Sequence, residues 1–105
     1  MTTAMRLTLP TALVLQAVHR GFRHGFDIMD ASGLSSGTVY PILRRLESTG
    51  MLRARWESVA DARDAQRPPR RYYELTAAGS RALAGAKERF PGIAHALAPG
   101  ASPAT

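Results

Sequence analysis

The stretch LSSGTVYPILRRLESTGML, residues 34–52, decides the fold of this 105-residue chain. It predicts a helix that begins at an N-cap serine, Ser35 or Ser36, and ends just before Gly50. At about 100° per residue, the apolar residues of the stretch fall on one side of that helix. They are Val39, Ile42, Leu43 and Leu46. The stretch therefore predicts a helix with one buried side and one side facing solvent.

The solvent-facing side is unusual because its residues are small, hydroxyl-bearing or cationic, and Glu47 is the only acid in the stretch. Its members are Ser35, Ser36, Gly37, Thr38, Tyr40, Pro41, Arg44 and Arg45. Hydroxyl groups and arginines donate hydrogen bonds to phosphates and base edges. The first N–H groups of a helix attract anions, and a glycine there lets a backbone come close. This side therefore predicts contact with a polyanion.

Pro41 lies about one turn into the predicted helix. A proline there gives up one backbone hydrogen bond and destabilises the helix locally. Two interpretations stay open. The ring is either a rigid apolar contact for a thymine methyl or a sugar, or only the mark of an irregular first turn.

Two shorter helices are predicted before this stretch. The first has Pro10 in its opening turn, apolar residues at helical spacing, and Gly21 as its stop. The second lies within residues 22–33, and its spacing predicts that Phe22, Phe26 and Met29 share a buried side. It is joined to the helix of residues 34–50 by a short turn at Gly33, which is typical of a helix-turn-helix.

After Gly50 the period changes from that of a helix to that of a strand. The segments LRARWE, residues 52–57, and RYYEL, residues 71–75, alternate apolar and polar residues and predict two strands. The polar residues 58–69 between them predict a long hairpin loop. Thr76 is expected to cap a last helix, which Pro91 either kinks or replaces by a new segment.

The predicted order is helix, helix, helix, strand, wing, strand, helix. This is a mainly α fold with a small β-hairpin (α+β), the architecture of a winged helix-turn-helix. We expect residues 8–76 to form this DNA-binding domain. Residues 77–98 are expected to form a C-terminal dimerisation helix, and residues 99–105 a disordered tail.

Composition narrows the possible partners. The chain has no cysteine, which excludes a disulfide framework and a thiolate metal site. No apolar run approaches the ~18 residues of a membrane span, and the run at 13–18 predicts a core helix, so we expect a cytoplasmic protein without a membrane partner. The net charge is +6, and between residues 44 and 71 eight arginines stand against four acids. This excess favours nucleic acid first and an anionic membrane second, with a generic solubilising surface as the alternative.

The sequence favours neither an enzyme nor a metal protein. The histidines are scattered, and no nucleophile–base–acid set or glycine-rich phosphate loop is present. His24, Asp27 and Asp30 drift around a helix and lack a fourth ligand, so we predict no metal and no cofactor. Trp56 alternates onto the buried side of its strand; the alternative is that it lines an effector pocket with Phe90.

Four segments in order, HGFDIM, LSSGTVYPILRRLESTGML, RARWE and RPPRRYYELTAAG, closely resemble the PadR family of winged helix-turn-helix transcriptional regulators. The resemblance runs from about residue 9 to residue 83, and GTVYPILRRLE is its most specific part. It implies a homodimeric transcription factor, usually a repressor, that binds an inverted-repeat DNA operator and is released by a small hydrophobic effector. The alternative is a winged-helix module that binds protein, for which an apolar or acidic third helix would be typical.

The resemblance also assigns roles to residues outside the third helix. It implies that Arg70 and Arg71 lie at the base of the wing, and we expect Arg63, Arg67, Arg70, Arg71 and Tyr72 to lie near phosphate. The residues expected in the dimer contact are Leu83, Ala86, Phe90, Ile93 and Leu97, which keep 3-4-3-4 spacing. The wing departs from the family pattern, because AQRPPRRYY has Gln66 where glycine is common and carries an extra proline.

Overall fold

The computed structural model of the protein describes residues 7–96. Its elements are α1 (Leu9–His19), α2 (Gly25–Ser32), α3 (Ser36–Ser48), β1 (Leu52–Trp56), α4 (Val59–Asp64), β2 (Arg71–Leu75), α5 (Ala77–Arg89) and the 3-10 helix η1 (Pro91–His95). The helices and the single antiparallel hairpin confirm the mainly α fold with a small β-hairpin. None of the described helices is long and apolar enough to cross a membrane.

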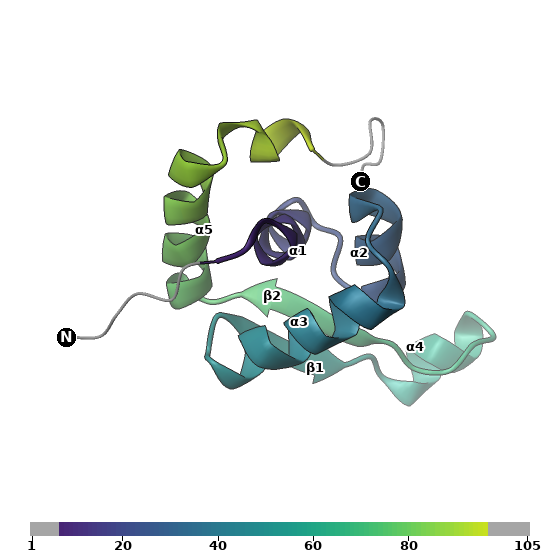
Figure 1. The fold of residues 1–105 in the computed structure, drawn as a ribbon. Helices are drawn as coiled ribbons and strands as arrows, with labels where there is room; N and C mark the ends of the chain where they lie inside the picture. The colour runs from purple at the N-terminus through teal and green to yellow at the C-terminus, as the bar shows by residue number, and fades with distance from the viewer. Residues whose placement is uncertain (1–6, 97–105) are drawn as a thin grey trace.

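Helix α1 is the centre of the core. It begins at the N-cap Thr8, with Pro10 in the first turn, and the chain leaves it through Gly21 at φ 101°. Val14 and Leu15 of α1 are fully buried. Helices α2 and α5 lie on either side of α1, and the hairpin and α3 close the remaining side (Figure 1).

Helices α2 and α3 form the predicted helix-turn-helix, with Gly33 at φ 76° between them. The prediction for the buried side of α2 was wrong at Phe26, whose exposed fraction is 66%. Helix α2 begins at Gly25, so Phe22 precedes it and the helical spacing from Phe22 does not apply. Ile28 and Ala31 supply the buried side of α2 instead.

Helix α3 has the predicted N-cap, Ser35, and the predicted stop at Gly50. Gly50 has φ 81°, its N–H donates to the carbonyl of Glu47 at 3.1 Å, and the N–H of Met51 donates to Leu46 at 2.9 Å. This is a Schellman motif, which satisfies carbonyls at the end of the helix. The apolar stripe of α3 is buried as predicted: Val39, Ile42, Leu43 and Leu46.

Strands β1 and β2 pair antiparallel, with Leu52 opposite Leu75 and Trp56 opposite Arg71. Burial falls along β1 from Leu52 in the core to Trp56, whose exposed fraction is 63%. The expectation that Trp56 is buried was therefore wrong. Trp56 stands at the wing end of the hairpin, where the strand has left the core behind.

The wing is not the irregular loop that the sequence predicted, because it contains α4. Ser58 is the N-cap of this helix, and its Oγ accepts a hydrogen bond from the N–H of Asp61 at 3.0 Å. Ala62 is buried. After α4 the chain turns back at Gln66, which has φ 59°. The wing is therefore a short capped helix followed by a tight return (Figure 1).

The C-terminal helix is interrupted at Pro91. Helix α5 starts at the N-cap Thr76, whose Oγ1 accepts from the N–H of Gly79 at 3.1 Å, and ends at Arg89; Pro91 begins η1. The guanidinium of Arg89 donates to the carbonyl of Leu7 at 2.9 Å and holds the end of α5 beside the start of α1. The segment after α5 is therefore folded back on α1.

This folding back changes the expected dimer contact. Leu83, Ala86 and Ile93 are buried within the chain, so in this conformation they do not form a surface for a partner. Their 3-4 spacing marks intramolecular packing on α1. Phe90 is half-buried, and Leu97 and the predicted tail at 99–105 lie outside the described residues.

Candidate nucleic-acid interface

The side of α3 opposite its apolar stripe is open to solvent. Thr38 is half-buried, and the other predicted members are exposed: Ser35, Ser36, Gly37, Tyr40, Pro41, Arg44 and Arg45. The structure thus brings all the helix residues predicted to contact DNA onto one accessible surface. We call this surface the α3 face.

The first turn of α3 has space and donors for an anion. A Cβ added to Gly37 would meet only Ser35 Oγ, at 3.9 Å, so nothing in the described protomer requires glycine at this position. The hydroxyl of Ser35 donates to Thr38 Oγ1 at 3.3 Å and does not cap the helix backbone. The N–H of Thr38 donates to the carbonyl of Ser35 at 3.0 Å, and the N–H groups of Ser36 and Gly37 remain available to a negatively charged group from outside.

The one acid on α3 is neutralised within the protein. Glu47 Oε2 accepts a hydrogen bond from Arg71 Nη2 at 2.8 Å. The guanidinium of Arg71 also lies 5.2 Å from the ring centre of Trp56, a cation–π arrangement. The positive charge of Arg71 thus offsets the one negative charge on α3, so Glu47 repels an anion at the α3 face less.

Tyr40 links the α3 face to the base of the wing. Its ring lies directly against Gly25, where an added Cβ would overlap the ring. A hollow of about 260 Å³ opens beside Tyr40 and is bounded by the first residues of α2 and by Arg70. Gly25 was not predicted as a site residue, because its role is to make room for the ring of Tyr40, which lies 15 residues further along the chain. Tyr40 and Arg70 therefore border one continuous surface.

The predicted wing residues divide into two groups. Arg63 is exposed and Arg70 half-buried, and neither makes an ion pair within residues 7–96. Arg67, Arg71 and Tyr72 bind acids of the same chain, namely Glu57 and Glu47. Their contact with DNA stays a prediction. In the structure each of them makes a hydrogen bond that holds the wing or the hairpin in position.

Glu57 is the residue at this site that sequence reasoning missed. Its carboxylate accepts hydrogen bonds from both terminal nitrogens of Arg67, from the N–H of Arg70 at 3.3 Å and from the Tyr72 hydroxyl at 3.4 Å. These bonds, led by those from Arg67, lower the pKa of Glu57 to about 2. A carboxyl group with a lowered pKa in the folded state stabilises the fold at any pH above its pKa in the unfolded chain, which is about 4.3. This stabilisation is lost progressively as the pH falls from that value through about 2, and with a pKa of about 2 the carboxylate is ionised at neutral pH.

His24 stands where α2 begins and touches the wing. It is buried, its Nε2 lies 3.0 Å from Asp27 Oδ2, and its ring meets the ring of Tyr72 edge-on at 5.7 Å. Burial lowers the pKa of His24, and Asp27 opposes that shift. Among residues 7–96 no three His, Cys, Asp or Glu side chains gather in a way that could hold a metal ion.

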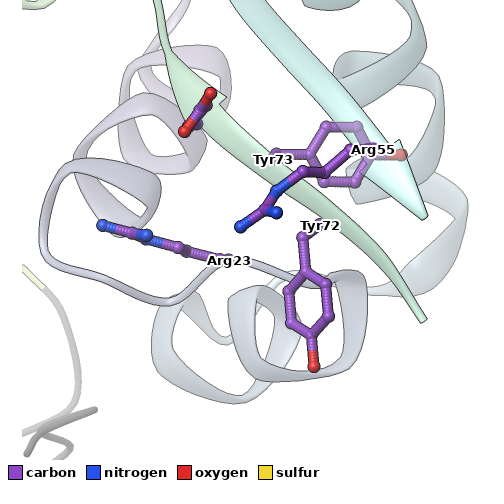
Figure 2. A pocket seen from close by; sticks show the side chains of 5 residues that line it. Arg23, Arg55, Tyr72 and Tyr73 are labelled. Atoms are coloured by element: carbon purple, nitrogen blue, oxygen red, sulfur yellow. The ribbon is translucent and has the colours of Figure 1, made fainter. Parts of the chain in front are cut away.

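A second hollow, of about 200 Å³, lies between the loop after α1 and the hairpin (Figure 2). It is lined by Arg23, Arg55, Tyr72, Tyr73 and Glu74. The backbone N–H of Tyr73 donates to the carbonyl of Arg23 at 2.8 Å, which fixes the loop to the free edge of β2. Charged groups of both signs line this hollow, and it contains neither Trp56 nor Phe90, which the alternative from the sequence had paired in an effector pocket.

Comparisons with known proteins agree with this fold. The family model described as "Transcriptional regulator PadR-like family" matches residues 14–85. A PadR-like transcription factor from Bacteroides fragilis is similar in structure, with a TM-score of 0.63, 26% identity, and coverage of 81% of this chain and 82% of that one. Pex from Synechococcus has a TM-score of 0.55 at 25% identity, with 81% and 83% of the two chains covered.

A PadR family transcriptional regulator from Eggerthella lenta is also similar, with a TM-score of 0.52 at 25% identity and coverage of 83% of this chain and 75% of that one. A search of curated proteins found no significant match.

Proposed function

Because the chain belongs to the PadR-like family of transcriptional regulators, we propose that its α3 face binds double-stranded DNA sequence-specifically. The family's members are transcriptional regulators and not enzymes, which confirms the prediction that this chain is not an enzyme. The observation that carries the proposal is the accessible α3 face, whose one nearby acid is already paired with Arg71. A location in the cytoplasm is part of the same proposal.

In this proposal α3 enters the major groove. Arg44, near the middle of the exposed side, reads guanine or binds phosphate, and the serines and the free N–H groups of the first turn take the backbone. The wing lies along the adjacent minor groove with Arg63 and Arg70 next to phosphates. Pro41 is exposed on the α3 face, which favours the interpretation of its ring as an apolar contact to the DNA.

The experiment that tests DNA binding is the salt dependence of affinity. Duplex fragments selected by the protein from genomic DNA should bind with a log K that falls linearly against log salt. The slope should be about −0.9 for each phosphate neutralised. A winged helix that binds protein instead would show no duplex affinity at low salt, or an affinity that does not respond to salt.

We further propose that two copies bind an inverted repeat as a repressor, with their α3 helices in successive major grooves about 34 Å apart. Since Leu83, Ala86 and Ile93 are buried in this conformation, we expect the contact between copies to use other residues. Leu9 has an exposed fraction of 45%, and Phe90 is half-buried. The hydrogen bond from Arg89 to Leu7 places these two apolar residues in one region, which supports a subunit contact there.

Changing Leu9 to aspartate should therefore shift the protein from dimer to monomer, because a carboxylate at an apolar contact loses its hydration without a partner. Sedimentation velocity measures the change. The control is Val59→Asp on α4, where the side chain is also exposed but lies on the wing. A Leu9→Asp variant that sediments as a dimer would place the contact elsewhere.

Release by a small effector remains part of the proposal. Within residues 7–96 the hollow of Figure 2 is the place that suits it best, because its wall residue Tyr72 also binds Glu57 in the wing. The guanidinium groups of Arg23 and Arg55 and the carboxylate of Glu74 line it, so the hollow suits a small hydrophobic effector that also carries polar groups.

A further inference from the structure

The wing is closed at its neck by the backbone of two residues. The hairpin ladder ends at the pair Trp56 and Arg71, and the next residues on each strand, Glu57 and Arg70, meet directly. The N–H of Glu57 donates to the carbonyl of Arg70 at 2.7 Å. The chain therefore leaves the hairpin and returns to it through a single narrow point.

The carboxylate of Glu57 adds a second closure at the same point. Its side chain has an exposed fraction of 11%, and it binds Arg67 through both oxygens as well as the N–H of Arg70. A bidentate guanidinium–carboxylate pair fixes angle as well as distance. Arg67 is therefore held toward the neck, in an orientation that a single hydrogen bond would not define.

Arg67 carries this constraint to α4. Its backbone N–H donates to the carbonyl of Ala62 at 3.1 Å, so the residue bound by Glu57 is also bound to the end of the wing helix. Arg63 immediately follows Ala62 and is exposed. The angle of Arg63 relative to the hairpin thus depends on the Glu57–Arg67 pair.

The same carboxylate ties the wing to the helix-turn-helix. The Tyr72 hydroxyl donates to Glu57, and the Tyr72 ring meets His24, the N-cap residue of α2. Glu57 thus stands between the two parts of the protein that, in the proposed complex, touch DNA.

We propose that Glu57 is a positioning residue for DNA recognition. Together with Arg67 it holds the wing at one angle to α3, so that Arg63 and Arg70 reach backbone phosphates while α3 occupies the groove. Glu57 itself does not touch DNA, and Arg67 acts through Glu57 and not as a phosphate ligand. This inference rests on the proposed function and names residues that control it.

The hairpin offers a matched control in the pair of Arg53 and Glu74. These side chains join at 3.1 Å across the same two strands, with exposed fractions of 69% and 42%. They lie four residues from the neck along each strand, and no hydrogen bond joins them to α4 or to Tyr72. Glu74→Gln therefore removes the same charge from the same hairpin without touching the wing.

The experiment compares Glu57→Gln, Arg67→Gln, their double variant and Glu74→Gln on a duplex that the wild-type protein has selected from genomic DNA. We expect Glu57→Gln to lower affinity ~10-fold or more, and to flatten the salt slope by roughly one phosphate for each wing arginine that is lost. Hydroxyl-radical footprinting should show that the backbone sugars beside the wing lose their protection and that those beside α3 keep it. Measured without an effector, Glu74→Gln should stay within about twofold of wild type, because Glu74 borders the proposed effector hollow and not the α3 face.

The double variant separates positioning from direct contact. If both residues act through one clamp, the double variant loses no more affinity than Glu57→Gln alone. Additive losses would mean that Arg67 contacts DNA by itself and would overturn the inference. An unchanged footprint and affinity in Glu57→Gln, in a protein whose wild type binds, would overturn it as well.

Folding is controlled independently of binding. Each variant is assayed at a temperature where circular dichroism shows the native helix content. If Glu57→Gln does not fold, Arg67→Lys replaces it, because lysine keeps the charge but cannot bind both oxygens. The expected loss of wing protection is the same. A wild-type protein without duplex affinity would overturn the proposed function itself, which distinguishes that failure from this one.

Discussion

Replacing Gly79 by alanine is expected to destabilise the fold by about 2 kcal/mol or more, at the upper part of what overpacking costs in protein interiors. Gly79 lies in the first turn of α5 and is buried against the turn between α3 and β1. A Cβ at this position would overlap the carbonyl oxygen of Met51, a backbone atom that cannot rotate away. Thermal unfolding should show the midpoint lowered by ~10 °C or more, since 1 kcal/mol shifts a domain of this size by about 4–8 °C.

Gly85 in the same helix is the matched control. A Cβ there would meet nothing within 4 Å, and the residue is exposed. Gly85→Ala should raise stability by up to about 1 kcal/mol, the ordinary preference of a helix for alanine. If Gly79→Ala were as stable as Gly85→Ala, the close approach of α5 to Met51 would be wrong.

Replacing Arg44 by alanine should lower specific DNA affinity by about 1–3 kcal/mol, the range for loss of a guanidinium that reads a base. Arg44 is exposed on the α3 face and makes no ion pair among the described residues, so its removal leaves no orphaned acid. Fold stability should therefore stay within about 0.5 kcal/mol of wild type. Titration of the selected duplex against a scrambled duplex measures the loss of specificity.

Arg53→Ala provides the comparison for charge alone. It removes the same positive charge from the hairpin surface, where Arg53 pairs with Glu74. Both variants should weaken nonspecific binding slightly and alike, but only Arg44→Ala should change the preference between duplexes. Equal effects on both duplexes from both variants would mean that the α3 face does not read the sequence.

The helix-turn-helix could be predicted because its signals are local. Ser35 and Gly50 mark the ends of α3, and the apolar stripe between them has one period throughout. Gly21 and Gly33 similarly mark the ends of α1 and α2. These signals depend on residues within a turn or two of one another, so the sequence shows them directly.

Helix α4 was missed although it carries a local signal. Ser58 followed three residues later by Asp61 is a capping pattern, and the structure shows Ser58 accepting the N–H of Asp61. The polar composition of the segment outweighed that pattern in the prediction. Ala62 is the one buried side chain of α4, too little apolar surface to produce a stripe in the sequence.

The error at Phe26 came from the start of α2, and the error at Trp56 has another cause. Alternation and helical spacing tell which side of an element a residue occupies, but not where along the element the core ends. Trp56 is on the correct side of β1 yet beyond the core, and its ring is covered by Arg71 instead. Such limits depend on the placement of neighbouring elements, which no local pattern contains.

The candidate site was likewise predictable where it depends on one helix and not where it depends on distant residues. The residues of the α3 face share one helix, so their common exposure followed from periodicity. Whether an arginine of the wing is free or paired depends on Glu57 and Glu47, which lie 10 and 24 residues from their partners along the chain. The division of the wing arginines therefore required the structure.

The junction near Gly50 and Thr76 has a mechanical consequence. The Thr76 hydroxyl donates to the carbonyl of Gly50 at 2.6 Å, and the N–H of Thr76 donates to Met51 at 3.2 Å. Two hydrogen bonds therefore join the start of α5 to the turn that ends α3. A change in the direction of α5 is therefore expected to shift the end of α3 as well, and with it the direction of the α3 face.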